Sequence, residues 1–272
     1  RGADYRASGA VPGYMLSQWS RSEYDGYLRG ASTDTPEWWD GPESESMVTV
    51  LATAGDELRT VGSVDGLGRG ERIYSVRFFG DMGYVVTFRQ VDPLYVIDLS
   101  NPQRPQVRGE LKIPGYSAYL HPVGNEAVLG VGQDADLDGR ILGLQASLFD
   151  ISDPDDPARI DRYTMQNGHS EVEWDHHAFL HDPTTGLTVF PYERWDEGKA
   201  GLSPTGALVL TVTEDGIRET GVVSHDPDGA EWWMPIRRSL LINGNLVTVS
   251  DAGVMVSDAD SLDTIDWVGF NR

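Results

Sequence analysis

Short apolar segments separated by turns recur along the whole chain, and helical periodicity is hard to find. The clearest stretch alternates apolar and polar positions over Ile73–Phe78, turns at a glycine-rich segment, and returns over Tyr84–Phe88. Leu94–Ile97 and Val107–Leu111 supply a third and a fourth apolar segment after further turns. Four antiparallel strands in about forty residues are typical of one blade of a β-propeller.

The four-stranded unit is repeated. Residues 148–154 (Leu-Phe-Asp-Ile-Ser-Asp-Pro) echo residues 96–102 (Val-Ile-Asp-Leu-Ser-Asn-Pro) at an offset of 52. We interpret the shared Asp, Ser, Asn and Pro residues as hairpin turns, because Asx side chains bond to the local backbone and Pro presets φ. The pattern predicts an all-β fold: a β-propeller of four-stranded antiparallel blades, about five in this chain, which form either a complete ring or part of a larger one. We expect one propeller region over residues 1–272, with blades at 14–65, 72–113, 116–165, 175–224 and 235–270.

The charge balance excludes one class of function. Forty-three acidic residues against twenty-one basic ones give a net charge of −22, whereas a nucleic-acid binder needs a basic surface. The acids are spread along the chain, which favours a solvated surface adapted to high salt or to keeping the protein soluble; cation binding at particular Asp clusters is the alternative. No apolar run approaches the ~20 residues of a membrane span. The absence of cysteine excludes disulfides and thiolate metal sites.

One acidic loop has the spacing of calcium ligands. Asp134, Asp136 and Asp138 stand at positions one, three and five, Gly139 allows a sharp turn at position six, and the Arg140 carbonyl adds an oxygen at position seven. The usual ligand types are missing at positions nine and twelve, and no helices flank the loop, so it is not an EF-hand. The sequence predicts Ca²⁺ at this loop, with an acidic Asp-Gly hairpin turn as the alternative.

A second cluster of metal-ligand types lies over residues 169–177 and contains Asp175, His176 and His177. Histidine and carboxylate together bind Zn²⁺ or a related metal. If this segment is a strand, however, the two adjacent histidines point to opposite faces and do not easily share one ion. Packing or hydrogen bonding is therefore the favoured role, and metal binding the alternative.

Motifs for other chemistry are lacking. The sequence has no G-x-S-x-G elbow, no H-E-x-x-H and no phosphate-binding glycine loop. We interpret the pairs Trp38–Trp39 and Trp232–Trp233 as packing at blade edges. The alternative is that they stack on sugars, in which case a glycan is a ligand of the chain.

Several long segments occur together in an ordered series. They are Gly70–Phe78, Tyr84–Asp98, Gly109–Tyr116, Tyr119–Pro122, Ser147–Pro154, Asp175–His176 with Ala178–Leu180, and Arg238–Ile242. In these segments the chain resembles secreted and cell-surface beta-propeller domain-containing proteins of bacteria and archaea. The resemblance implies a propeller fold and an extracellular location, and brings no established catalytic activity. It also implies Lys where this chain has His177, and further sequence before Gly13–Ser20.

These observations favour an extracellular, calcium-stabilised scaffold for binding or cell-surface assembly. The alternative is a metal-dependent enzyme that acts on glycans or another extracellular substrate through Asp175, His176 and His177. An unclosed ring exposes the apolar faces of its end blades, around Tyr14–Trp19 and Ile236–Ile242. We expect a protein partner, or a further segment of the same protein, to cover them. A self-contained five-bladed ring is the other possibility.

Overall fold

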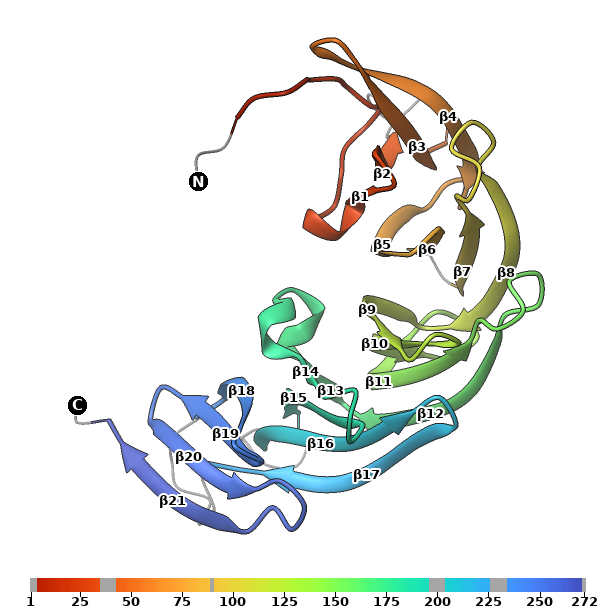
Figure 1. Ribbon diagram of the computed structural model, residues 1–272. Coiled ribbons are helices and arrows are strands. Elements are labelled where there is room, and N and C mark those ends of the chain that lie inside the picture. Colours follow the sequence, from red (N-terminus) through yellow and green to blue (C-terminus); the bar gives the residue numbers. More distant parts are fainter. Residues whose placement is uncertain (1–3, 35–42, 89–90, 196–203, 226–233, 271–272) are drawn as a thin grey trace. The chain divides into compact units, whose positions relative to one another are not determined.

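The computed structural model describes residues 4–34, 43–88, 91–195, 204–225 and 234–270. In these ranges the regular elements are β-strands and three short 3-10 helices. The strands form five antiparallel sheets, each with its strands side by side in sequence order (Figure 1). This arrangement confirms the expected all-β fold of four-stranded blades. Within the same ranges, none of the helices has the length and apolar character that a membrane crossing demands.

The chain divides into two compact units. The first comprises residues 1–116, 137–139 and 151–158, and it contains two sheets and the short helix η1 (Gln18–Ser20). The strands of its first sheet are β1 (Arg21–Tyr24), β2 (Tyr27–Asp34), β3 (Glu45–Ala54) and β4 (Glu57–Leu67). Those of its second sheet are β5 (Arg72–Phe79), β6 (Met82–Phe88), β7 (Val91–Asp98) and β8 (Gln106–Pro114).

The second unit comprises the remaining residues and three sheets. The third sheet of the chain is formed by β9 (Tyr116–Val123), β10 (Ala127–Ala135), β11 (Ile141–Asp150) and β12 (Ala158–Gln166). The fourth is formed by the short pieces β13 (Gly168–His169) and β14 (Leu180–His181) with β15 (Leu187–Arg194), β16 (Thr205–Thr213) and β17 (Gly216–Val223). The fifth is formed by β18 (Ile236–Ile242), β19 (Asn245–Ser250), β20 (Gly253–Asp258) and β21 (Thr264–Gly269).

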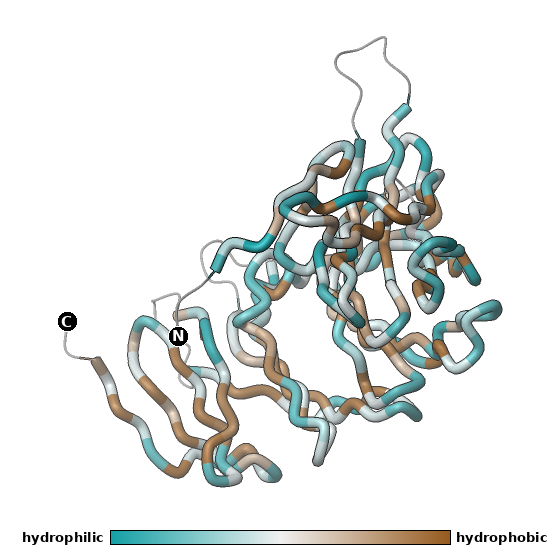
Figure 2. The backbone as a smooth tube through the Cα atoms, turned by 45° about the horizontal axis from the view of Figure 1, so that its top comes forward, coloured by the Kyte–Doolittle hydropathy of each residue, from teal (hydrophilic) through white to brown (hydrophobic). Residues whose placement is uncertain are grey.

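Burial falls from the middle of a sheet to its fourth strand. Strand β10 is buried along its whole length, whereas β21 is exposed along its whole length. Figure 2 shows hydrophobic residues gathered along strands and hydrophilic residues at many turns. In the first unit, Val48 of β3 and Val85 of β6 belong to one apolar cluster, and in the second, Val209 of β16 and Leu246 of β19 share another. Each core therefore lies between neighbouring sheets, as face-to-face sheet packing requires.

Within the first unit, the repeated proline turns pack against glycines of other strands. The turn after β7 brings its Pro102 carbonyl against Gly62 of β4, and the turn after β11 brings its Pro154 carbonyl against Gly109 of β8. A Cβ atom at either glycine would collide with backbone, so only glycine fits. Residue 61 of β4 and residue 108 of β8, which directly precede these glycines, are the extra residues of β-bulges. The first of these turns thus connects the two sheets of this unit, in addition to ending a hairpin.

A buried arginine ties the first two sheets of this unit together. Arg29 of β2 is only 3% exposed; its Nη1 donates to the carbonyl oxygen of Gly80 (2.6 Å) and its Nη2 to the hydroxyl of Ser22 (2.9 Å). Its guanidinium carbon also lies 4.9 Å from the ring centre of Tyr24 and 5.1 Å from that of Phe78. Burial lowers the pKa of Arg29. It lines a polar pocket of about 200 Å³ at the turns of the two sheets.

Candidate functional site

The first strand of the fourth sheet is interrupted. β13 pairs with β15 through Gly168 and His169, and β14 pairs with the same strand through Leu180 and His181. Residues 170–179 leave the sheet between these pieces and form two 3-10 helices, η2 (Glu171–Glu173) and η3 (His176–Ala178). In Figure 1 this insertion is the green coil beside the label β14. It is the largest departure from a regular first strand among the five described sheets.

Local capping explains why the insertion folds this way. The Val172 N–H donates to the hydroxyl of Ser170, and the Ser170 N–H donates to Oε1 of Glu173, which is a capping box. The Ser170 hydroxyl also donates to the Pro191 carbonyl of β15 (2.5 Å), so the start of η2 is anchored to the sheet. Asp175 caps η3 by accepting the His177 N–H (3.0 Å).

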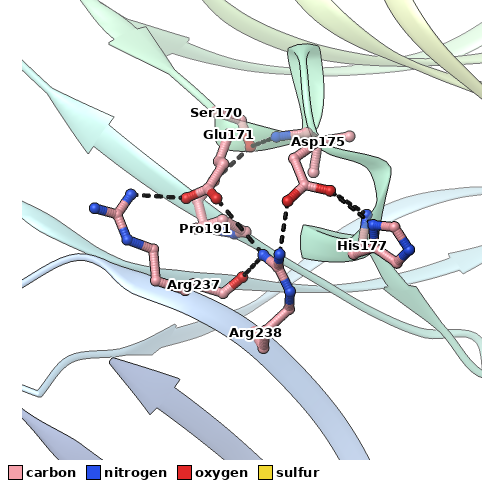
Figure 3. A network of polar contacts seen from close by, with 8 residues as sticks. Ser170, Glu171, Asp175, His177, Pro191, Arg237 and Arg238 are labelled. Atoms are coloured by element: carbon pink, nitrogen blue, oxygen red, sulfur yellow. Dashed lines mark hydrogen bonds and ion pairs between the residues drawn. The ribbon is translucent and has the colours of Figure 1, made fainter. Parts of the chain in front are cut away.

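Two arginines of β18 fasten the insertion to the fifth sheet (Figure 3). Nη1 of Arg237 lies 2.9 Å from Oε2 of Glu171, and Nη1 of Arg238 lies 3.5 Å from the other oxygen of the same carboxylate. Nη2 of Arg238 lies 2.6 Å from Oδ2 of Asp175. Two acidic and two basic side chains therefore alternate across the contact, and their formal charges balance.

The electrostatics keep Asp175 ionised. Burial opposes its charge, but the backbone N–H and ring of His177 and the guanidinium of Arg238 outweigh that effect and lower the pKa of the carboxyl group. Oδ1 of Asp175 lies 2.9 Å from Nδ1 of His177, whose side chain is 68% exposed. Asp175 thus presents one oxygen to arginine and the other to histidine.

The expectation that His176 and His177 lie on a strand, with opposite orientations, is wrong. Both belong to η3, and their ring centres are 4.0 Å apart. One ligand atom each of Asp175, His176 and His177 lies within 4.8 Å of the others, and no second group of three such side chains occurs in the described ranges. The tight 3-10 turn brings together side chains that the period of a strand would separate.

Aromatic side chains surround the insertion. The imidazole of His169 lies almost parallel to the rings of Trp174 (6.0 Å, 29°) and Trp195 (5.8 Å, 18°), and these tryptophans are 67% and 63% exposed. Phe179, which follows η3 directly, contacts His121 of β9 (4.8 Å between ring centres). Burial lowers the pKa of the neighbouring His181. These aromatic contacts were not predicted from the sequence.

The calcium loop lies at the hairpin between β10 and β11. The Asp136 N–H donates to the Arg140 carbonyl (3.0 Å), and the Arg140 N–H donates to Oδ1 of Asp136 (2.9 Å), so these two residues close the turn. Asp134 is buried near the end of β10, and its Oδ1 lies 3.1 Å from Nη1 of Arg162. Asp138 lies at the tip of the hairpin. Calcium binding by this loop stays a prediction. Trp38–Trp39 and Trp232–Trp233 fall outside the described residues.

Four-stranded antiparallel sheets in sequence order, repeated along one chain, define a β-propeller type of protein. The chain belongs to the beta propeller domain family, whose model matches residues 1–262. The expected resemblance is therefore confirmed. The chain is 38% identical to an uncharacterized protein of Methanocaldococcus jannaschii, in a match that covers 97% of this chain and 38% of that protein. It is also 47% identical to an uncharacterized protein of Archaeoglobus fulgidus over 67% of this chain and 27% of that protein.

The chain thus spans well under half the length of these two relatives. Among solved structures, it is similar to a Bacteroides ovatus protein proposed to be a dipeptidyl aminopeptidase IV, with a TM-score of 0.54. That match covers 92% of this chain and 39% of the other at 10% sequence identity, so it supports the fold alone.

Proposed function

We propose that this chain is an extracellular binding scaffold that engages a protein partner through the insertion of the fourth sheet. The observation that carries the proposal is the exposed indole of Trp174, which a capped and ion-paired turn holds at the surface between η2 and η3. Tryptophan and arginine are the residue types that most often dominate the free energy of protein–protein binding. The side chains of Arg237 and Arg238 are 36% and 39% exposed, and they form ion pairs with Glu171 and Asp175 of the same insertion.

Preorganisation supports the same assignment. A surface that is already rigid loses little conformational entropy when a partner binds. Here the capping box at Ser170, the Ser170–Pro191 hydrogen bond and the Arg238–Asp175 ion pair fix the insertion without a ligand. Places where a chain abandons its regular pattern are often functional, and this insertion replaces the middle of a strand.

Two further parts of the proposal rest on the sequence. The extracellular location follows from the resemblance to secreted and cell-surface propeller proteins. Stabilisation by Ca²⁺ at Asp134, Asp136, Asp138 and the Arg140 carbonyl follows from the ligand spacing. The Asp136 carboxylate and the Arg140 carbonyl, two of the proposed ligands, lie at the same turn of this loop.

Site-specific photo-cross-linking tests the partner. A photoreactive phenylalanine analogue at position 174 is compared with the same analogue at position 160, where Ile160 of β12 is 46% exposed. On intact cells of the source organism, we expect one cross-linked polypeptide from position 174 and none from position 160. Excess unlabelled chain should suppress the product, and excess Trp174→Ala chain should not.

Once the cross-linked polypeptide is identified and purified, its Kd for the chain measures how much Trp174 contributes to binding. Trp174→Ala should weaken the Kd about 30-fold, since a binding hot spot contributes about 2 kcal/mol or more. Ile160→Ala serves as the matched control and should leave the Kd unchanged. Equal cross-linking from both positions, or none from position 174, would contradict the proposal.

A further inference from the structure

Three potential metal ligands stand in consecutive positions on η3 and its cap. Asp175, His176 and His177 each offer one donor atom within 4.8 Å of the other two, and two of the three are only partly exposed. Two imidazoles and one carboxylate are a donor set that divalent transition metals prefer, whereas Ca²⁺ and Mg²⁺ prefer oxygen alone. We propose that these three side chains bind one divalent transition-metal ion, of the class of Zn²⁺, Co²⁺ and Ni²⁺.

The distances suit adjacent ligands of one ion. Nδ1 of His177 and Oδ1 of Asp175 are 2.9 Å apart. Two ligands at about 2.05 Å from an ion and at right angles to each other are separated by about 2.9 Å, and by about 3.3 Å in a tetrahedral arrangement. An ion can therefore take the place of this hydrogen bond while the two atoms keep nearly the same separation. The ring centre of His176 lies 4.0 Å from that of His177, and one of its ligand atoms lies within 4.8 Å of the donor atoms of Asp175 and His177.

The surrounding residues orient the carboxylate. Arg238 holds Oδ2 of Asp175 at 2.6 Å, which leaves Oδ1 directed at His177. Arg238 is in turn fixed by its hydrogen bond to the Arg237 carbonyl (2.6 Å) and by Glu171. Groups that orient ligands from behind are a regular part of metal sites, and their loss weakens metal affinity by about 10- to 100-fold.

Charge does not oppose the ion. Glu171 and Asp175 balance Arg237 and Arg238, and the net charge of −22 raises the concentration of cations near the chain. His177 is 68% exposed, so the three side chains leave coordination positions open to water or to a ligand. The site is thus a metal centre with room for an external donor.

Isothermal titration of the metal-free chain, produced without a histidine tag, tests the proposal. Zn²⁺ and Co²⁺ are titrated in a buffer with millimolar Ca²⁺, which occupies oxygen-only sites. We expect about one ion per chain, and Co²⁺ should show the visible absorption of a site with nitrogen ligands. His177→Ala and His176→Ala should each weaken binding about 100-fold, and Arg238→Met should weaken it about tenfold.

His225→Gln is the matched control, because it removes a histidine that lies outside the cluster and its amide can still bond to the Ser250 and Thr248 hydroxyls, and it should bind as tightly as the unaltered chain. The melting temperature of each variant verifies folding, and His177→Gln offers a milder replacement if His177→Ala does not fold. Binding that survives both histidine substitutions, or that millimolar Ca²⁺ abolishes, would overturn the proposal, as would no binding at all. The measurement uses the chain alone, so its outcome is independent of the proposed protein partner.

Discussion

His225 is a buried imidazole whose protonation should couple stability to pH. It follows β17 and is 7% exposed. Its Nδ1 lies 2.7 Å from the Ser250 hydroxyl, its Nε2 lies 2.8 Å from the Thr248 hydroxyl, and the ring of Trp267 meets it edge-on at 4.8 Å. Both polar partners are uncharged, so they do not compensate the charge of an imidazolium. Burial accordingly lowers the pKa of His225 from 6.5 to about 4.

The direction of the pH effect on the free energy of unfolding follows from the number of protons that the folded and the unfolded chain bind. Between pH 4 and 6.5 the unfolded chain binds a proton at residue 225 that the folded chain does not, so the free energy of unfolding falls as pH falls. With these two pKa values, the loss relative to pH 7.5 is about 2 kcal/mol at pH 5 and about 3 kcal/mol at pH 4. Because His225 is almost fully buried, solvent screening reduces these values little.

Urea unfolding at several pH values, at fixed salt and calcium, measures this loss. Burial also lowers the pKa of His181, so the pH effect of His225 is taken from the comparison between variants. His225→Gln can still bond to both hydroxyls but carries no titrating ring. Between pH 7.5 and pH 5, the unaltered chain should lose about 2 kcal/mol more than His225→Gln.

His177→Gln controls for the general effect of replacing an imidazole by an amide. Parallel pH profiles for the unaltered chain and His225→Gln would refute the reasoning, because they would show that the imidazole is not desolvated by folding.

Four other expectations have equally direct tests. Chelation of calcium should lower the melting temperature, and Asp136→Ala should abolish that sensitivity; an unchanged melting curve in chelator would contradict the calcium site. The net charge of −22 should make the chain more stable in molar KCl than in dilute buffer, since the Debye length falls from ~30 Å at 0.01 M to ~3 Å at 1 M; equal stability at fixed free calcium would show that repulsion is negligible. Gly109→Ala should lower the free energy of unfolding by about 1–3 kcal/mol, because its Cβ meets the Pro154 carbonyl, whereas the Cβ of Gly269→Ala meets only ordinary contacts; equal melting temperatures would contradict the close approach of Pro154 to Gly109. If the end blades need a covering polypeptide, light scattering should show that the purified chain associates with itself or with another polypeptide. A well-folded monomer of ~30 kDa would instead favour a self-contained five-bladed ring.

The blades could be predicted because their determinants are local. Alternation along residues 73–78 and 84–88 and the repeated Asp-Ser-Pro turns specify strands and hairpins without reference to distant residues. The contacts that these turns make with glycines of other strands were not predictable from the sequence. Gly62 and Gly109 look like ordinary strand glycines in the sequence, and only the folded chain shows that the carbonyls of Pro102 and Pro154 lie against them.

The features of the candidate site also fall into those that the sequence indicated and those that only the tertiary structure showed. Ser170 and Glu173 have the spacing of a capping box, and Asp175 is a common helix cap, so the sequence by itself contained the signal that residues 170–179 turn. A single 3-10 turn is too short to produce a periodic pattern, however, and the two histidines were assigned to a strand. The partners of Glu171 and Asp175 are arginines more than sixty residues away, and only the packing of the fifth sheet against the fourth brings them into contact. Local turn chemistry was therefore determined by the sequence, whereas the tertiary structure decided which charges meet, because long-range contacts depend on how the sheets pack.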